Sequence, residues 1–309
     1  MRDTVDRDDR WPEIDVGTWA ETKRRLHLYA QMLGKLRVAL SPPEPNWMHT
    51  RLLFTPCGIT TGAMPLAHGT IDATLDVLTS EIVVRTSGGE RRAVALASAP
   101  TVAAVYGALN EELAALGLRG AISPIPQELA DTTPFDRDTR TGVYDPAAVQ
   151  RWFRVATAVA GVFDRWRSPF FGRSGVQLWW GALDVSVGLF NGRHATPPAD
   201  RGYIMRYDLD AELLSAGFYL GDEASSPFFY AYVYPQPAGD PPAVRPAEAA
   251  WSDQLREWVL PYDAVRTAEH PADVLCAFLD DAYEHCFTWA AWDRAACSYD
   301  APPRSAPRP

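Results

Sequence analysis

Three polar residues recur at a spacing of four near the start of the chain: His27, Gln31 and Lys35. Because residues four apart lie on the same side of a helix, we expect these side chains to form one row, turned away from the leucines of the same segment. Such a row could present a proton donor and a cation to an anionic or carbonyl-bearing ligand. The alternative is an ordinary solvated helix face.

Four carboxylates lie on the polar sides of segments with strand-like alternation: Asp72, Asp76, Asp184 and Glu212. For Asp72 and Asp76 a water-exposed outer face of a sheet is the simpler interpretation. Asp184 and Glu212 have aromatic neighbours that would desolvate them, namely Trp179, Trp180, Phe218 and Tyr219. If two sheets face each other across a cleft, burial and mutual repulsion would split the pKa values of these two carboxylates.

Aromatic residues are the most unusual feature of the composition, with 11 tryptophans. Trp47, Trp179 and Trp180 occur in strand-like segments near glycine or proline, and we predict that they line an apolar pocket. The alternative is ordinary core packing, which is expected for four tryptophans on predicted helices: Trp152, Trp166, Trp289 and Trp292. The further residues expected to contact a ligand are Gln31, Gln177, Arg193, Phe218 and Tyr230.

Metal and cofactor motifs do not occur in the sequence. The histidines show no HxH or HExxH spacing, and the chain lacks the glycine-rich phosphate loops and the GxSxG elbow. Cys57, Cys276, Cys286 and Cys297 form no CxxC pair, which argues against a zinc knuckle or a disulfide framework. We therefore expect no metal and no cofactor.

The charge balance excludes some partners. The 309 residues include 29 Lys plus Arg and 39 Asp plus Glu, a net charge of −10. This balance lacks the basic stripe that nucleic acid or an anionic membrane requires. There is no run of about 18 apolar residues, and the charged start lacks the apolar stretch of a signal peptide. We expect a cytoplasmic protein whose partner is a small molecule, with a homodimer left open.

Hydrophobic periodicity predicts an α+β fold with antiparallel sheets and packed helices. A capping box at Thr18 to Glu21 begins a helix of about six turns. Further helices are expected from Pro100 to Gly117, from Asp145 to about 166, near 247–258 and from Pro271. Strands are expected near the following ranges: 51–56, 70–78, 81–86, 91–96, 176–180, 182–190, 203–209, 211–219 and 228–234.

The order of these elements suggests an internal duplication. Each half runs from a helix to a glycine followed by a base (Gly34-Lys35 and Gly172-Arg173), then to an aromatic strand, more strands and a helix. We predict two α+β halves, 11–140 and 141–297, related by a pseudo-twofold axis. The alternative is a chance match, since a helix followed by a meander is a common order. Residues 1–10 and 298–309 are expected to be disordered.

Motifs spread over residues 11–294 resemble an uncharacterised bacterial family, the domain of unknown function numbered five-nine-nine-six. They include Gly34-Lys35, Tyr144-Asp145-Pro146, Trp180-Gly181, Ser215-Ala216-Gly217-Phe218 and Trp292-Asp293-Arg294. The resemblance implies little about activity, because the family has no assigned function.

Histidines of the family pattern are missing from this chain. The family's Asn-His-Trp-Trp is here Asn46-Trp47-Met48-His49, its Val-His is Val176-Gln177, its His-Glu is Ala211-Glu212, and a further histidine is Ser80. Strand-borne histidines would suit a metal or proton-transfer site. Their absence implies that this member has either lost such an activity or acquired different chemistry.

These features favour a cofactor-independent, metal-independent enzyme that acts by general acid/base chemistry on an apolar or aromatic small molecule. Isomerisation, cyclisation, elimination and hydrolysis are all compatible. Glu212 or Asp184 would be the acid or base, His27 a second proton carrier, and Lys35 or Arg193 a charge stabiliser. The alternatives are a non-catalytic small-molecule-binding protein and a protein-interaction scaffold.

Overall fold

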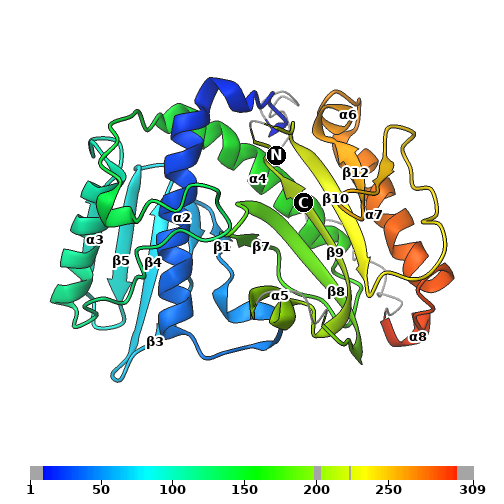
Figure 1. Ribbon diagram of the computed structural model, residues 1–309, viewed down its shortest axis with the longest axis horizontal. Helices are drawn as coiled ribbons and strands as arrows, with labels where there is room; N and C mark the ends of the chain where they lie inside the picture. The colour runs from blue at the N-terminus through cyan, green and yellow to red at the C-terminus, as the bar shows by residue number, and fades with distance from the viewer. Residues whose placement is uncertain (1–9, 198–202, 223, 298–309) are drawn as a thin grey trace, which may run out of the picture. The chain divides into compact units, whose positions relative to one another are not determined.

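The computed structural model describes residues 10–197, 203–222 and 224–297. It has the predicted α+β fold, with helices and antiparallel sheets (Figure 1). The chain forms two compact units. Unit 1 comprises Met1–Ala160, Gln177–Val185 and Tyr219–Pro227, and unit 2 comprises Gly161–Val176, Ser186–Phe218 and Phe228–Pro309. The internal duplication and the two consecutive halves stay predictions. The two expected disordered ends, 1–10 and 298–309, lie outside the described residues except for Arg10.

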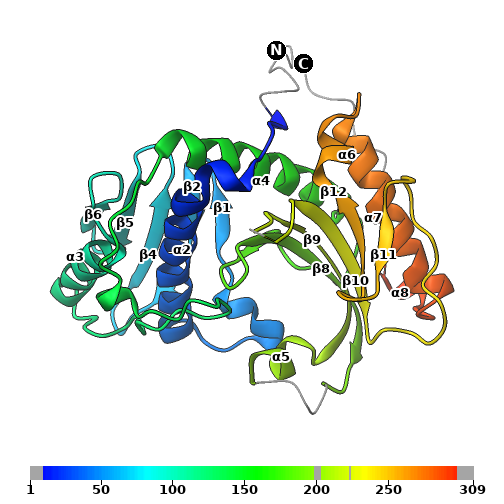
Figure 2. The same ribbon diagram turned by 45° about the horizontal axis from the view of Figure 1, so that its top comes forward.

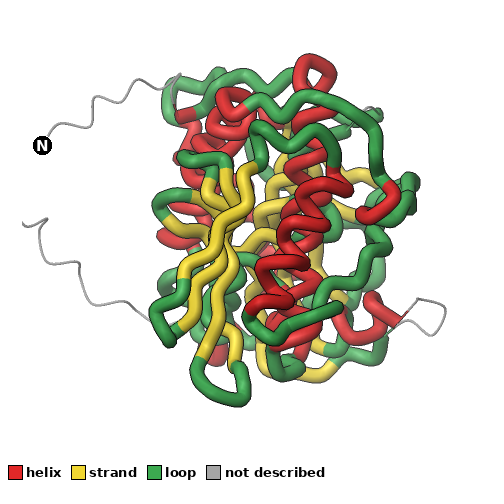
Figure 3. Tube along the Cα trace, turned by 90° about the vertical axis from the view of Figure 1, so that its left-hand side faces the viewer, coloured by secondary structure: helices red, strands yellow, loops and turns green. Residues whose placement is uncertain are grey.

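Unit 1 contains an antiparallel sheet in the order β1-β2-β4-β5-β6, with β3 paired to β4. Its strands are β1 (Leu53–Thr55), β2 (Gly58–Thr60), β3 (Met64–Pro65), β4 (Thr70–Asp76), β5 (Glu81–Thr86) and β6 (Arg91–Ala95). They run side by side (Figure 3). Ala73 and Leu75 of β4 pair with Val84 and Ile82 of β5, and all four are buried as expected. Asp76 on the other side of β4 is buried as well, so the water-exposed position expected for it is wrong.

Helix α2 (Ala20–Leu40) contacts β3 and β4 of this sheet and runs roughly along the strands (Figure 2). Helix α3 (Val102–Ala115) contacts β6 and α2. Gly117 follows α3 with φ +80°, a left-handed conformation that glycine adopts without strain, and so confirms the predicted helix end. Short 3-10 helices occur at η1 (Val16–Trp19), η2 (Pro45–Thr50) and η3 (Phe135–Arg137).

The predicted capping box at the start of α2 is wrong. Trp19 is the N-cap residue and forms no side-chain cap, while the Thr18 hydroxyl donates to the carbonyl of Asp15 at 2.8 Å. Asp15 caps instead, one turn earlier, by accepting from the backbone N–H of Gly17 at 3.0 Å. Because this carboxylate is the stronger cap, the chain enters α2 through the 3-10 turn η1.

The second sheet has the order β11-β12-β10-β9-β8-β7. Its strands are β7 (Gln177–Trp179), β8 (Asp184–His194), β9 (Ala211–Tyr219), β10 (Phe228–Tyr234), β11 (Ala250–Ser252) and β12 (Glu257–Pro261). The remaining helices are α4 (Pro146–Trp166), α5 (Tyr203–Asp208), α6 (Tyr262–Arg266), α7 (Pro271–Thr288) and α8 (Arg294–Cys297). In unit 2, helices α6 and α7 pack against each other and against β10.

Two predicted elements in unit 2 are wrong. The segment expected as a strand at 203–209 is helix α5, and the helix expected near 247–258 is strands β11 and β12. The run from Ala247 to Ala250 has high helix propensity, and the predicted helix rests on this run. In the structure Trp251 and Trp258 lie opposite each other on paired strands, with ring centroids 5.4 Å apart, so cross-strand packing overrides local propensity.

Candidate functional site in unit 1

Four polar side chains, four residues apart, lie along one side of α2 and contact three other segments of unit 1. Lys23 Nζ donates to the carbonyl of Gly221. His27 and Gln31 bind backbone groups of other segments, and Lys35 Nζ lies 5.7 Å from the ring centroid of Trp180. We call these four residues the polar row. The structure therefore confirms that His27, Gln31 and Lys35 share one side of the helix, but that side is buried rather than solvated.

His27 is held by two backbone carbonyls. Its Nε2 lies 2.9 Å from the carbonyl oxygen of Trp180 and 2.9 Å from that of Gly181. Carbonyls only accept, so Nε2 must carry the proton, which leaves Nδ1 with its lone pair. Burial lowers the pKa of His27 to about 4 although both carbonyls favour the charged form. His27 is therefore a neutral imidazole of fixed tautomer at neutral pH.

Gln31 makes a two-point contact with the backbone of Gln127. Its amide nitrogen donates to the Gln127 carbonyl at 2.7 Å, and its oxygen accepts from the Gln127 N–H at 2.9 Å. Both polar ends of this fully buried side chain are thereby satisfied. Gln31 thus positions the segment at 127–128, and its expected ligand contact stays a prediction.

Lys35 is a buried cation without a counter-charge. The residue is 6% exposed, and within the described part of the chain its amine forms neither an ion pair nor a hydrogen bond. Burial lowers the pKa of Lys35 to about 8. A fraction of the amine is therefore unprotonated near neutral pH and can accept a proton.

Trp180 is fixed between α2 and η2. The indole ring packs on Gly34, where an added Cβ would overlap the ring, and its Nε1 donates to the carbonyl of Thr50 at 2.9 Å. Only glycine at position 34 allows this approach. The indole is buried and holds the face against which the Lys35 amine lies. Its role as a pocket wall stays a prediction.

Glu128, which no sequence pattern marks, lies beside Gly181. It is exposed as a residue, yet its carboxylate lies against Gly181, where an added Cβ would overlap it. Burial of the carboxylate raises the pKa of Glu128, and no ion pair or hydrogen bond involves this side chain in the described residues. Its φ of +57° is a left-handed conformation that costs a non-glycine residue energy, as is common at functional sites.

Asp184 lies in the same unit and is buried, at 6% exposure. Its charge acts on Tyr219, whose pKa is raised well above its usual range by burial first, then by the hydrogen bond to Asp222 and by the negative charges of Asp222 and Asp184. The Tyr219 hydroxyl donates to Asp222 at 2.8 Å. Lys23 Nζ lies 6.0 Å from the Tyr219 ring centroid, so these groups form the neighbourhood of the first residue of the polar row.

Glu212 and Arg193 belong to unit 2, on β9 and β8. Arg193 Nη2 lies 2.7 Å from Glu212 Oε2, which also accepts a hydrogen bond from the Asn191 amide at 2.6 Å. The Arg193 side chain is 51% exposed, the arrangement of a surface ion pair. The catalytic and binding roles expected for these two residues stay predictions.

The remaining predicted ligand contacts are dispersed. Phe218 packs in the unit 2 core, 5.0 Å from Phe229 between ring centroids, and Tyr230 covers Gly217. Gln177 is buried on β7, and Trp179 is half-buried at the end of that strand. Trp47 is in η2 rather than on a strand, with φ +54° and its ring 5.4 Å from His49. The structure brings together His27, Gln31, Lys35 and Trp180.

A signal in the composition could have identified the polar row. The chain has 29 Lys plus Arg, of which only Lys23 and Lys35 are lysine, and both lie in this row. Arginine cannot lose its proton near neutral pH, whereas a buried lysine can. The two lysines are therefore the basic residues, other than histidine, whose side chains can lose a proton near neutral pH when they are buried.

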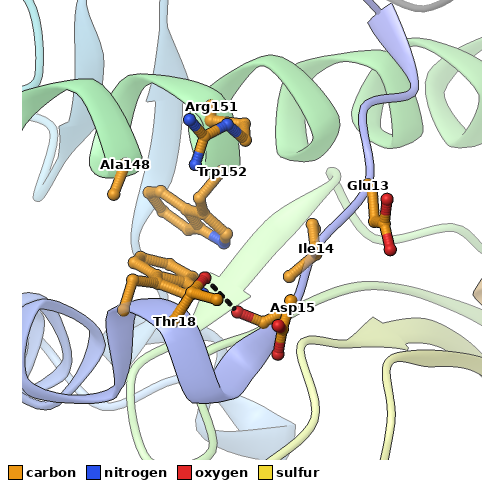
Figure 4. A pocket seen from close by; sticks show the side chains of 8 residues that line it. Glu13, Ile14, Asp15, Thr18, Ala148, Arg151 and Trp152 are labelled. Carbon is orange, nitrogen blue, oxygen red and sulfur yellow. Dashed lines mark hydrogen bonds between the residues drawn. The ribbon is translucent and has the colours of Figure 1, made fainter.

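A separate pocket of about 280 Å³ lies in unit 1 between η1 and the start of α4 (Figure 4). Trp19 and Trp152 supply apolar surface, and Glu13, Asp15 and Arg151 supply charge. Its volume is close to the lower limit of small-molecule sites. None of the residues that line it belongs to the polar row.

The described residues contain neither a metal-binding cluster nor a helix that could span a membrane. No cluster of three or more His, Cys, Asp or Glu side chains there has a geometry that could hold a metal ion. No helix there is long and apolar enough to cross a membrane. All four cysteines are free.

Comparison with known proteins identifies the family alone. No curated protein and no solved structure matches the chain. A family model, described as a family of unknown function (DUF5996), matches residues 11–299, nearly all of the described chain. This match confirms the resemblance drawn from the sequence motifs, and the chain belongs to the DUF5996 family.

Proposed function

We propose that unit 1 is the catalytic part of a general acid/base enzyme for a small molecule that carries a carbonyl group or an acidic proton. Lys35 accepts the proton, Glu128 donates one, and His27 holds the 180–181 backbone beside them. This assignment replaces the charge-stabilising role expected for Lys35 by a proton-accepting one. The proposal rests mainly on one observation, the buried Lys35 amine that has no carboxylate partner among the described residues.

The opposite pKa shifts of Lys35 and Glu128 support this division of roles. Burial lowers the pKa of the amine to about 8 and raises the pKa of the carboxyl. Both groups are therefore displaced toward the pH at which an acid or base works best. A base that is partly neutral, paired with a carboxyl whose pKa is raised, suits proton transfer of the kind that isomerisation or elimination requires.

Deuterium uptake from solvent tests the proposal directly. The protein is incubated in D₂O with a panel of small ketones, aldehydes, keto acids and aromatic carbonyl compounds, and loss of substrate C–H signals is followed by proton NMR. We expect exchange with at least one class of compound. Exchange should fall at least a hundredfold in Lys35→Arg and in Glu128→Gln, since general acid/base groups typically contribute about 10²–10⁴-fold.

Matched variants distinguish the roles of these side chains. Lys35→Arg keeps the positive charge but cannot act as a base, so retained exchange in this variant would leave only a charge-stabilising role. Lys23→Met and Glu212→Gln remove a lysine and a carboxylate elsewhere and should retain exchange. If Glu212→Gln abolishes exchange while Glu128→Gln does not, the acid/base site lies in unit 2.

The second candidate is a non-catalytic small-molecule-binding protein, favoured by the pocket in Figure 4 with its two indoles and mixed charges. A compound that binds without exchange, and whose affinity falls in Arg151→Gln but not in Lys35→Arg, would support this candidate instead.

A further inference from the structure

Two arginine side chains of unit 1 lose contact with water where the C-terminal part of α2 meets η2, and the charge of one acts on the other. Arg37 is in the last turn of the helix and is 9% exposed, and Arg51 directly follows η2 and is half-buried. One Nη of Arg37 donates to the Thr61 carbonyl at 2.7 Å. One Nη of Arg51 reaches only the Met48 sulfur, at 3.3 Å, which is a weak acceptor.

The Nε–H groups of both arginines are buried and have no acceptor. Neither guanidinium forms an ion pair with a carboxylate in the described part of the chain. A buried donor without an acceptor costs free energy, and a buried charge without a counter-charge costs more. Two such groups whose charges act on each other are therefore an unfavourable arrangement for the protein alone.

The charges around the pair do not compensate it. Burial and the charge of Arg51 lower the pKa of Arg37, and Glu44 opposes this from a distance without forming an ion pair. His49 faces the same region, where burial lowers its pKa and the charge of Arg37 contributes. His49 Nδ1 accepts from the backbone N–H of Glu44 at 3.1 Å, so its free nitrogen also stays available.

The backbone of η2 places Arg51 beside α2. Asn46 and Trp47 have φ of +53° and +54°, two consecutive left-handed residues that reverse the chain after Pro45. Such strain persists only where the surrounding structure enforces it. The hydroxyl of Thr50 donates to the Trp47 carbonyl at 2.9 Å and closes the turn immediately before Arg51.

We propose that Arg37 and Arg51 form an oxyanion-binding site that takes the phosphate or carboxylate group of a small molecule. The Nε and one Nη of a guanidinium lie side by side and match two oxygens of such a group. An oxyanion between the two arginines satisfies both orphaned donors and screens the repulsion between the charges. The site uses no residue of the polar row, so it does not depend on the proposed function.

Anion-dependent stabilisation tests this site. Melting temperature and calorimetric binding are measured with inorganic phosphate and separately with malonate, at constant ionic strength balanced with sodium chloride. We expect one of these anions to raise the melting temperature in a saturable manner. Arg51→Gln should weaken the dissociation constant at least tenfold. Arg85→Gln is the matched control and should leave binding unchanged. Arg85 lies on β5, its side chain is 45% exposed, and it pairs with Asp72 at 3.9 Å.

The melting temperatures of the proteins without bound anion give a second test, in which Arg51→Gln should be stabilising. Without a bound anion, Arg51→Gln should melt at a higher temperature than the unmodified protein, because the repulsion from Arg37 is removed. Arg51 is half-buried, so this variant carries the test even if Arg37→Gln fails to fold. Preference for phosphate or for malonate identifies the anionic group. If neither anion binds, or if Arg51→Gln binds as tightly as Arg85→Gln, the proposal is wrong.

Discussion

Lys35 and His27 are buried ionisable side chains, and Glu128 is an exposed residue whose carboxylate is partly covered; none of the three forms an ion pair within the described residues. In each case burial disfavours the charged form, so the pKa of the two bases falls and that of the acid rises. Structural ion pairs stabilise charge instead, as Asp138 does with Arg24 at 2.6 Å and Arg140 at 2.8 Å. The contrast distinguishes groups that hold charge from groups that can exchange protons.

His27 makes the stability of the protein depend on pH in a defined direction. Its pKa falls from 6.5 in the unfolded chain to about 4 in the fold, so the unfolded state binds the extra proton between these values. The free energy of unfolding therefore decreases as the pH falls from 6.5 toward 4. The full effect is about 3 kcal/mol.

The matched variant is His27→Gln, which can still donate to the carbonyls of Trp180 and Gly181. Urea unfolding at pH 7 and pH 5 should show that the unmodified protein loses about 2 kcal/mol more than His27→Gln between the two values. Because other groups titrate alike in both proteins, the difference isolates His27. An equal loss in the two proteins would mean that His27 is not buried as a neutral ring.

At the level of elements, α2 determines how unit 1 is assembled. Its leucine face is buried with β3 and β4, and its polar row contacts Gln127, the 180–181 backbone and Gly221. Both sides of this helix are therefore covered. Gly34 is the point of closest approach, since Trp180 lies directly on its backbone.

Gly34→Ala should destabilise the protein although alanine is the better helix former. The propensity gain is about 1 kcal/mol, but the new methyl group would overlap the Trp180 ring, which the hydrogen bond to Thr50 holds in place. Overpacking of this kind costs about 1–3 kcal/mol or more, and loss of the indole position would add to it. Thermal unfolding should show a lower melting temperature.

Gly107→Ala in α3 is the matched control, because nothing lies within 4 Å of the added methyl group. This variant should gain about 0.5–1 kcal/mol of stability. If Gly34→Ala is stabilised as much as Gly107→Ala, the indole does not pack on α2 as described.

The sequence predicts the elements well where local pattern and tertiary contacts agree. Ile71, Ala73 and Leu75 are buried on β4 as their alternation predicts, and Asp145 caps α4 by accepting from the backbone N–H of Ala147 at 2.9 Å. The prediction fails where contacts between residues far apart in the sequence determine the local structure. The strand pairing of Trp251 with Trp258 overrides a helical run, and nothing local to Glu128 reveals that a segment more than fifty residues later lies against its carboxylate.

The polar row shows the same limit for the candidate site. The spacing of His27, Gln31 and Lys35 predicts a shared helix side, but its burial depends on Gln127 and on the segment at 180–181. The groups selected here for acid/base chemistry are an amine and a carboxyl, those of Lys35 and Glu128. The sequence alone cannot rank Lys35 or Glu128 above the other ionisable residues, because it does not show which charges lack partners in the folded protein.

At the level of the whole molecule, the chain returns to unit 1 twice after leaving it at Ala160, with Gln177–Val185 and Tyr219–Pro227. These two segments supply the carbonyls of Trp180, Gly181 and Gly221 that contact the polar row. Segments from three parts of the sequence therefore contribute to burying the row. Of the 29 Lys plus Arg residues in the chain, only two are lysine.

The scarcity of lysine permits one measurement on the full-length protein. When lysine labelled with ¹³C is incorporated, only Lys23 and Lys35 contribute side-chain Cε signals, and Lys35→Met assigns them. The Lys35 signal should titrate with a midpoint at about pH 8, in agreement with its burial without a counter-charge. A midpoint near the ordinary lysine value of about 10.4 would contradict the account, because Lys35 would then be a solvated or paired cation and could not serve as the base of unit 1.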